Sequence, residues 1–71
     1  MKYELAKEMN IKMLQYTREL NGFLLIIRDE CEADEFRRYQ MAIGKVLGYM
    51  FLDIMDPIYK EFPALKPPGI D

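Results

Sequence analysis

The segment from residue 41 to residue 55 most constrains how this chain can fold. Thirteen of its fifteen residues are apolar, aromatic or glycine, and only Lys45 and Asp53 carry charge. On a helix they form two separate apolar stripes, because residues three and four positions apart share a face. One stripe is Phe36, Ile43, Leu47, Met50 and Ile54, and the other is Met41, Gly44, Gly48, Phe51 and Met55. A helix that is apolar on two sides must be covered on both.

The rest of the chain offers little to provide that cover. A chain of 71 residues has room for one small core, and domains of this size usually rely on disulfides, a metal ion or oligomerisation. Cys31 is the only cysteine, so an intrachain disulfide is excluded, and histidine is absent. We therefore expect no metal and no cofactor, and we expect a second chain to cover the remaining apolar surface.

Charge and hydropathy narrow the possible partners. Ten basic and twelve acidic residues are scattered along the chain and give a net charge of −2. This pattern lacks the basic surface that binding to phosphates requires, so we expect no nucleic-acid partner. The longest apolar run is shorter than the roughly 20 residues that span a bilayer, so we expect no membrane partner. A lone thiol and an N-terminal sequence without the apolar centre of a signal peptide favour a cytoplasmic location.

The first half of the chain predicts one long helix over about 2–31. Its apolar residues recur every three or four positions at Ala6, Met9, Met13, Tyr16, Leu20, Phe23, Ile27 and Cys31. Asn21-Gly22 is a strong turn signal, and the residues after it could form a short strand instead. No second strand candidate exists to pair with such a strand, so we predict that the helix continues through Gly22.

The second half predicts a turn at about 32–34 and a second helix over about 35–56. Asp34 is a suitable N-cap residue for this helix. Pro57 ends or kinks the helix, because proline lacks the backbone N–H group and clashes with the preceding turn. We expect a short helical segment at 57–62 and an extended C-terminal tail at 63–71.

These elements predict an all-α fold, an antiparallel hairpin of two helices with the short C-terminal helical segment and tail. Residues whose numbers add to about 67 then face each other, which places Met9 against Ile58 and Met13 against Ile54. The hairpin can bury only the first stripe. We therefore predict that two copies form a four-helix bundle as a homodimer. The predicted interface consists of Met41, Gly44, Gly48, Phe51 and Met55 with Leu24 and Leu25.

The sequence offers weak candidates for chemistry. Lys45, Tyr49 and Asp53 follow one another at four-residue steps, which is typical of a solvated helix edge and also allows a small polar site. Cys31 lies among carboxylates, which disfavour the reactive thiolate. We therefore predict a non-enzymatic interaction or regulatory module that acts as a homodimer. The alternatives are an accessory subunit that docks on a larger protein and, third, a protein that binds or converts a small molecule.

Overall fold

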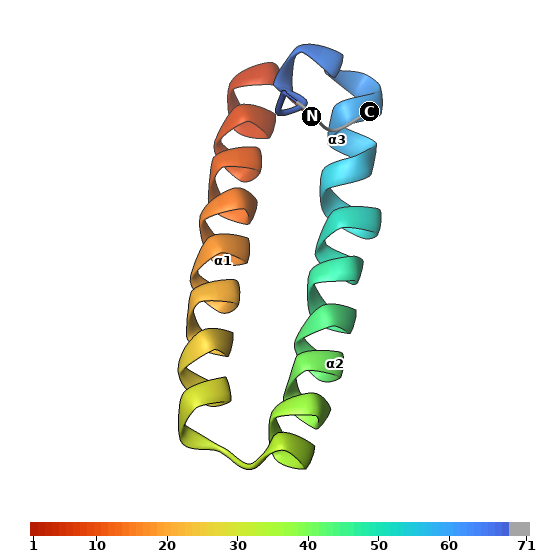
Figure 1. The fold of residues 1–71 in the computed structure, drawn as a ribbon. Helices are drawn as coiled ribbons and strands as arrows, with labels where there is room; N and C mark the ends of the chain where they lie inside the picture. Colours follow the sequence, from red (N-terminus) through yellow and green to blue (C-terminus); the bar gives the residue numbers. More distant parts are fainter. Residues whose placement is uncertain (69–71) are drawn as a thin grey trace.

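Helices form the framework of the molecule. The computed structural model describes residues 1–68, and this part of the chain contains no β-strand. Two long helices, α1 (Tyr3–Glu30) and α2 (Ala33–Tyr49), lie side by side and run in opposite directions (Figure 1). The predicted all-α class is confirmed. Helix α1 also continues through Asn21 and Gly22 without a break, as predicted.

The turn between the long helices is shorter than predicted. Helix α2 begins at Ala33, and the Phe36 N–H group donates to the Glu32 carbonyl at 2.9 Å, which closes the first helical turn. Asp34 therefore lies inside that turn and is not the N-cap residue, and no side chain caps the helix. Asp34 and Glu35 still lie where the helix dipole favours negative charge, which explains why the helix can begin before them.

The α-helical part of the second helix ends earlier than predicted, at Tyr49. A π-helical segment, η1 (Met50–Met55), follows, and the backbone then returns to an α-helix in α3 (Asp56–Glu61). The Asp56 N–H group donates to the Phe51 carbonyl, five residues back. Proline at position 57 has no N–H group to offer the preceding turn and its ring clashes there. The wider π-helical turn before Pro57 accommodates this defect without ending the helix.

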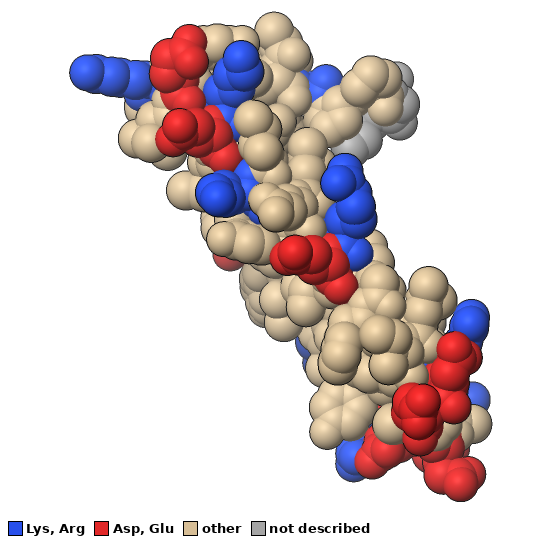
Figure 2. Space-filling view, turned by 90° about the vertical axis from the view of Figure 1, so that its left-hand side faces the viewer, with Lys and Arg blue, Asp and Glu red and all other residues tan. Residues whose placement is uncertain are grey.

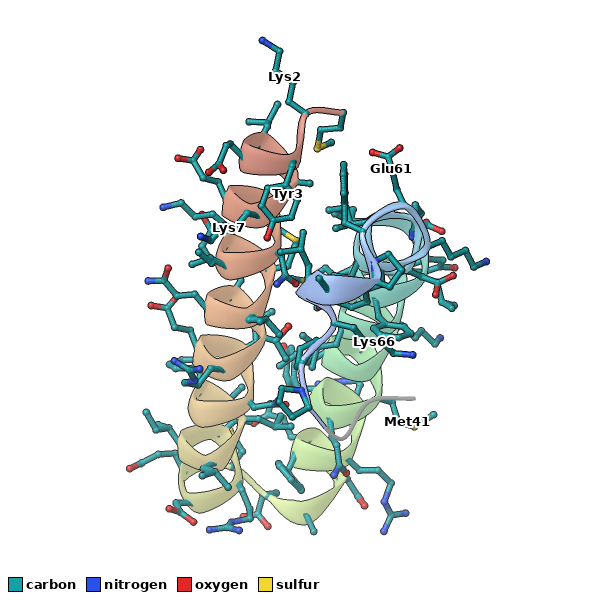
Figure 3. The ribbon with its side chains drawn as sticks, turned by 90° about the horizontal axis from the view of Figure 1, so that it is seen from above. Lys2, Tyr3, Lys7, Met41, Glu61 and Lys66 are labelled. Carbon is teal, nitrogen blue, oxygen red and sulfur yellow. The ribbon has the colours of Figure 1, made fainter. Side chains whose placement is uncertain are left out.

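The chain after α3 packs back onto the long helices, and we call residues 62–68 the C-terminal arm. Pro63–Leu65 forms a 3-10 turn, η2, so the prediction of an extended tail is wrong at these residues, and residues 69–71 lie outside the described part. The Asn10 side-chain amide donates to the Leu65 carbonyl at 3.2 Å, and the Phe62 ring meets the Tyr3 ring edge to face at 5.4 Å. In Figure 3 the arm turns from α3 towards α1 and lies between the two long helices in that view.

The core is small and lies at the end of the molecule opposite the turn, where α1 begins and α3 ends (Figure 1). It consists of Ala6, Met55, Ile58 and Tyr59. Asn10 is buried beside it and accepts a 2.5 Å hydrogen bond from the Tyr59 hydroxyl. The same burial raises the pKa of Tyr59, because the phenolate would lose its hydration. From residue 11 to residue 54 no side chain is fully buried, so the half of the molecule nearer the turn has no dry interior.

The two hydrogen bonds of Asn10 predict a measurable loss of stability on substitution. Asn10→Ala leaves the Tyr59 hydroxyl and the Leu65 carbonyl without this partner, and we expect it to lower the free energy of unfolding by about 1–2 kcal/mol. Asn21→Ala is the matched control, because Asn21 is exposed on the same helix and alanine is the better helix former there. Urea denaturation followed by circular dichroism measures both variants. Equal stability of the two variants would contradict a role for Asn10 in holding the arm.

Candidate interaction surface

Large apolar side chains are exposed along both sides of the helix pair. On α1 the exposed residues are Tyr3, Leu5, Ile11, Tyr16, Phe23, Leu25 and Ile26. On α2 and η1 they are Tyr39, Met41, Val46, Tyr49 and Leu52. Single exposed apolar residues are normal in soluble proteins, whereas a contiguous group of them marks a site of interaction. The question is therefore which of these residues form a common surface.

One contiguous apolar surface is a groove between α1 and η1. Seven residues line it: Met13, Tyr16, Glu19, Leu20 and Phe23 from α1, and Met50 and Ile54 from η1. It is open to solvent and has a volume of about 620 Å³. Glu19 is its only charged lining residue, and Phe23 is 57% exposed at its edge. We refer to these seven residues as the groove.

The distribution of charged side chains is compatible with an apolar binding surface. Figure 2 looks onto the side of α1 and shows acidic side chains gathered at the end of the molecule that holds the turn. Between the two ends, uncharged surface continues between the scattered charges (Figure 2). An apolar patch rimmed by charged residues is typical of a surface that binds another protein.

The residues of the predicted interface are not all available to a second chain. Met41 is 61% exposed and points away from α1 (Figure 3), and Leu25 is exposed, whereas Leu24 is partly buried. A Cβ atom added at Gly44 or Gly48 would meet nothing within 4 Å, so among residues 1–68 nothing outside the glycine's own helical turns packs closely on either position.

At the other end of the predicted interface the chain covers its own residues. The Phe51 ring lies 6.5 Å from the Tyr59 ring, and Met55 is only 4% exposed within the core. The prediction of an outward-facing stripe is therefore wrong at Met55. The difference arises in η1, because the five-residue hydrogen bonds of a π-helix widen the turn, so each residue advances by a smaller angle than in an α-helix. Over six residues the difference turns Met55 back towards α1.

Two features of the site were missed in the sequence. Tyr16, Phe23 and Met50 line an open groove although their spacing predicted contacts inside the helix pair. The hydrogen bonds of Asn10 were also missed. Their signal is present in the sequence, because Asn10 lies four residues after Ala6 and three before Met13, so a polar side chain interrupts an apolar face.

The candidates for chemistry lie on the surface. Lys45, Tyr49 and Asp53 are exposed, with Tyr49 at 67%, so they do not form an enclosed polar site. Residues 1–68 hold no group of three histidine, cysteine or acidic side chains that could bind a metal ion. In the same residues no helix has the length and apolar character that crossing a membrane requires.

Cys31 lies at the turn, next to acidic side chains. The Glu35 carboxylate accepts a hydrogen bond from its thiol, and this contact, together with loss of hydration and the negative charges of Glu35 and Glu30, raises the pKa of Cys31. The nucleophilic thiolate is therefore disfavoured at neutral pH, in agreement with the expectation from the neighbouring sequence.

Comparison of the chain with protein-family models, with curated proteins and with solved structures gives no match. The surface therefore has to be interpreted from its own geometry and chemistry.

The surroundings of Cys31 predict how fast it is alkylated. Because the raised pKa lowers the thiolate fraction, the folded protein should react with iodoacetamide at pH 8 more slowly than the same chain unfolded in urea. Glu35→Gln should accelerate the reaction of the folded protein, and Glu30→Gln should do so less, because Glu30 contributes only its charge. The pH profile of the alkylation rate provides the measurement. Equal rates for the two variants would contradict the hydrogen bond to Glu35.

The open space around Gly48 predicts a stabilising substitution. Gly48→Ala introduces no clash within the chain and replaces a poor helix former, so we expect it to raise the free energy of unfolding by about 0.5–1 kcal/mol. Gly22→Ala serves as the reference, because its added Cβ atom also meets nothing. Thermal unfolding compares the two. If Gly48→Ala alone is destabilising, a helix of another chain packs on the glycines after all.

Proposed function

We propose that the protein is a non-enzymatic interaction module that acts as a homodimer, with the groove of each copy covered by the other. The observation that carries this proposal is the excess of exposed surface. The chain exposes 5600 Å², whereas a compact monomer of 8.5 kDa exposes about 4700 Å². The excess of roughly 900 Å² is close to the ~800 Å² that one partner contributes to a protein interface of standard size.

The shape of the chain supports the same proposal. Its extents are 44 × 21 × 16 Å, and its radius of gyration of 14.4 Å exceeds the roughly 11 Å of a compact domain of this length. A single layer of two helices cannot enclose its side chains on both faces. A second layer of two helices would turn it into a four-helix bundle, in which each helix has neighbours on two sides.

The two faces of the helix pair differ in what is left to cover. Met55 is already buried in the core, and the Phe51 ring lies beside the Tyr59 ring of α3; both residues belong to the stripe of the predicted interface. Within residues 1–68 the groove has no such cover, and it combines apolar side chains from α1 and η1. We therefore place the dimer contact at the groove. Of the predicted interface, Met41, Gly44 and Leu25 are exposed, and Gly48 is partly buried.

A second copy is the occupant that the chemistry of the groove favours. Flexible Met13 and Met50 and the aromatic Tyr16 and Phe23 provide an adaptable apolar surface with a single carboxylate, which fits another surface of the same composition. In a dimer with a twofold axis, the same patch on each copy forms the whole interface, so no second kind of surface is needed. The exposed positions of Lys45, Tyr49 and Asp53 support a binding function over catalysis, and the unpaired thiol of Cys31 supports the cytoplasm as its location.

A substitution in the groove tests the proposal. The wild-type protein should have a mass of about 17 kDa by light scattering at micromolar concentration, twice the 8.5 kDa of one chain. Phe23→Gln removes an aromatic side chain from the groove, so the mass should fall towards that of one chain while helicity is retained. Tyr49→Gln is the control, because Tyr49 is an exposed aromatic residue outside the groove lining, and its dimer should persist.

Three results would overturn the proposal. A stably folded wild-type monomer would show that the groove needs no cover. A wild-type chain that aggregates alone and dissolves only with another protein would favour the accessory-subunit alternative. Dissociation by Tyr49→Gln with a stable Phe23→Gln dimer would place the contact on a different face.

A further inference from the structure

A self-complementary series of exposed side chains follows α1 beside the groove. Leu5, Lys12, Glu19 and Ile26 are each seven residues apart, and seven residues are close to two helical turns, so the four side chains share one face. All four are exposed, the two apolar ones by 55% and 53%, and Glu19 also lines the groove. We refer to these four residues as the heptad series.

The order of side-chain types along α1 makes the heptad series complementary to itself. Read forwards it is apolar, basic, acidic, apolar, and a second α1 helix running in the opposite direction presents apolar, acidic, basic, apolar. Suppose that two antiparallel copies of α1 cross between residues 15 and 16. Each residue then faces the residue of the other copy for which the two residue numbers add to 31. Lys12 then faces Glu19 of the partner subunit, and Leu5 faces Ile26 of the partner subunit. Every contact occurs twice because of the twofold symmetry.

The full overlap of the helices requires almost the same crossing point. Helix α1 extends from Tyr3 to Glu30, so its midpoint lies between residues 16 and 17, one residue from the crossing that pairs the charges. Two copies aligned by their charges therefore also overlap along nearly the whole helix. We propose that, in the homodimer proposed above, the two α1 helices pack antiparallel through the heptad series, with reciprocal Lys12–Glu19 ion pairs fixing the register. This inference rests on the proposed homodimer and adds its binding mode.

Charge reversal tests the register. In a Lys12→Glu dimer two carboxylates meet at each ion-pair position, and in a Glu19→Lys dimer two ammonium groups do, so each variant should dissociate with a Kd about tenfold higher than the wild type. The double variant K12E/E19K restores opposite charges and should return to within about threefold of the wild type. Sedimentation equilibrium measures the dissociation constants, and circular dichroism verifies that each variant is helical.

Mixing the two single variants gives the sharpest result. A chain with Lys12→Glu and a chain with Glu19→Lys present opposite charges to each other at both ion-pair positions. Energy transfer between differently labelled chains should therefore show that the mixed dimer is preferred over both homodimers, and that the preference weakens at high salt. Lys45→Glu is the matched control, since it makes the same charge change on α2 and should leave the wild-type Kd unchanged within about twofold.

The outcomes separate this inference from the proposed function. If the wild type is dimeric and Lys12→Glu behaves like Lys45→Glu, the antiparallel α1 pairing is overturned while the homodimer stands. If the wild type is monomeric, the proposed function fails and the pairing fails with it. The reciprocal pairing would also be overturned if both single variants dimerise more weakly than the wild type but their mixture shows no preference for the mixed dimer.

Discussion

The hydrogen bonds of Asn10 hold together the one part of the molecule that has a dry interior. Through its side chain, α1 is joined to Tyr59 on α3 and to the backbone of Leu65 in the C-terminal arm. Buried polar groups that lose their partners are costly, so these bonds also fix one arrangement of the three segments. The apolar contacts of Ala6, Met55 and Ile58 surround the same point. Because the core lies at one end, the apolar side chains in the opposite half of the helix pair stay partly exposed in the single chain.

Pro57 determines which face of the molecule is left uncovered. The wider turn of η1 before the proline rotates Met55 into the core, and Tyr59 on α3 then lies beside Phe51. Without that rotation, Met55 would lie on the outward stripe with Gly44 and Gly48. One backbone defect therefore helps to cover one end of this apolar face, and the groove between α1 and η1 remains open.

The sequence predicted where the helices lie along the chain better than it predicted which side chains each helix turns towards the core. The spacing of apolar residues in the first half was sufficient for α1, including its passage through Gly22, because a strand there would have had no partner. The spacing of apolar residues could not reveal η1. A proline is compatible with a kinked helix, a helix end or a widened helical turn, and the packing of the folded chain decides among these. That choice moved Met55 from the predicted interface to the core. The return of Leu65 to Asn10 was equally hidden, because its acceptor is a backbone carbonyl that any residue would provide.

The uneven distribution of buried residues makes the molecule's two ends behave differently. At the end opposite the turn, Met55, Ile58 and Tyr59 bury apolar surface within the chain, so this end is stabilised by intrachain contacts at any concentration. Between residues 11 and 54 the apolar side chains remain partly wet, and their burial in the proposed dimer would follow mass action. Stability measured at the turn end should then rise with protein concentration more steeply than stability at the core end. In the proposed dimer the same side chains would stabilise the helices and contact the second copy, so the order of the turn half would depend on the presence of that copy.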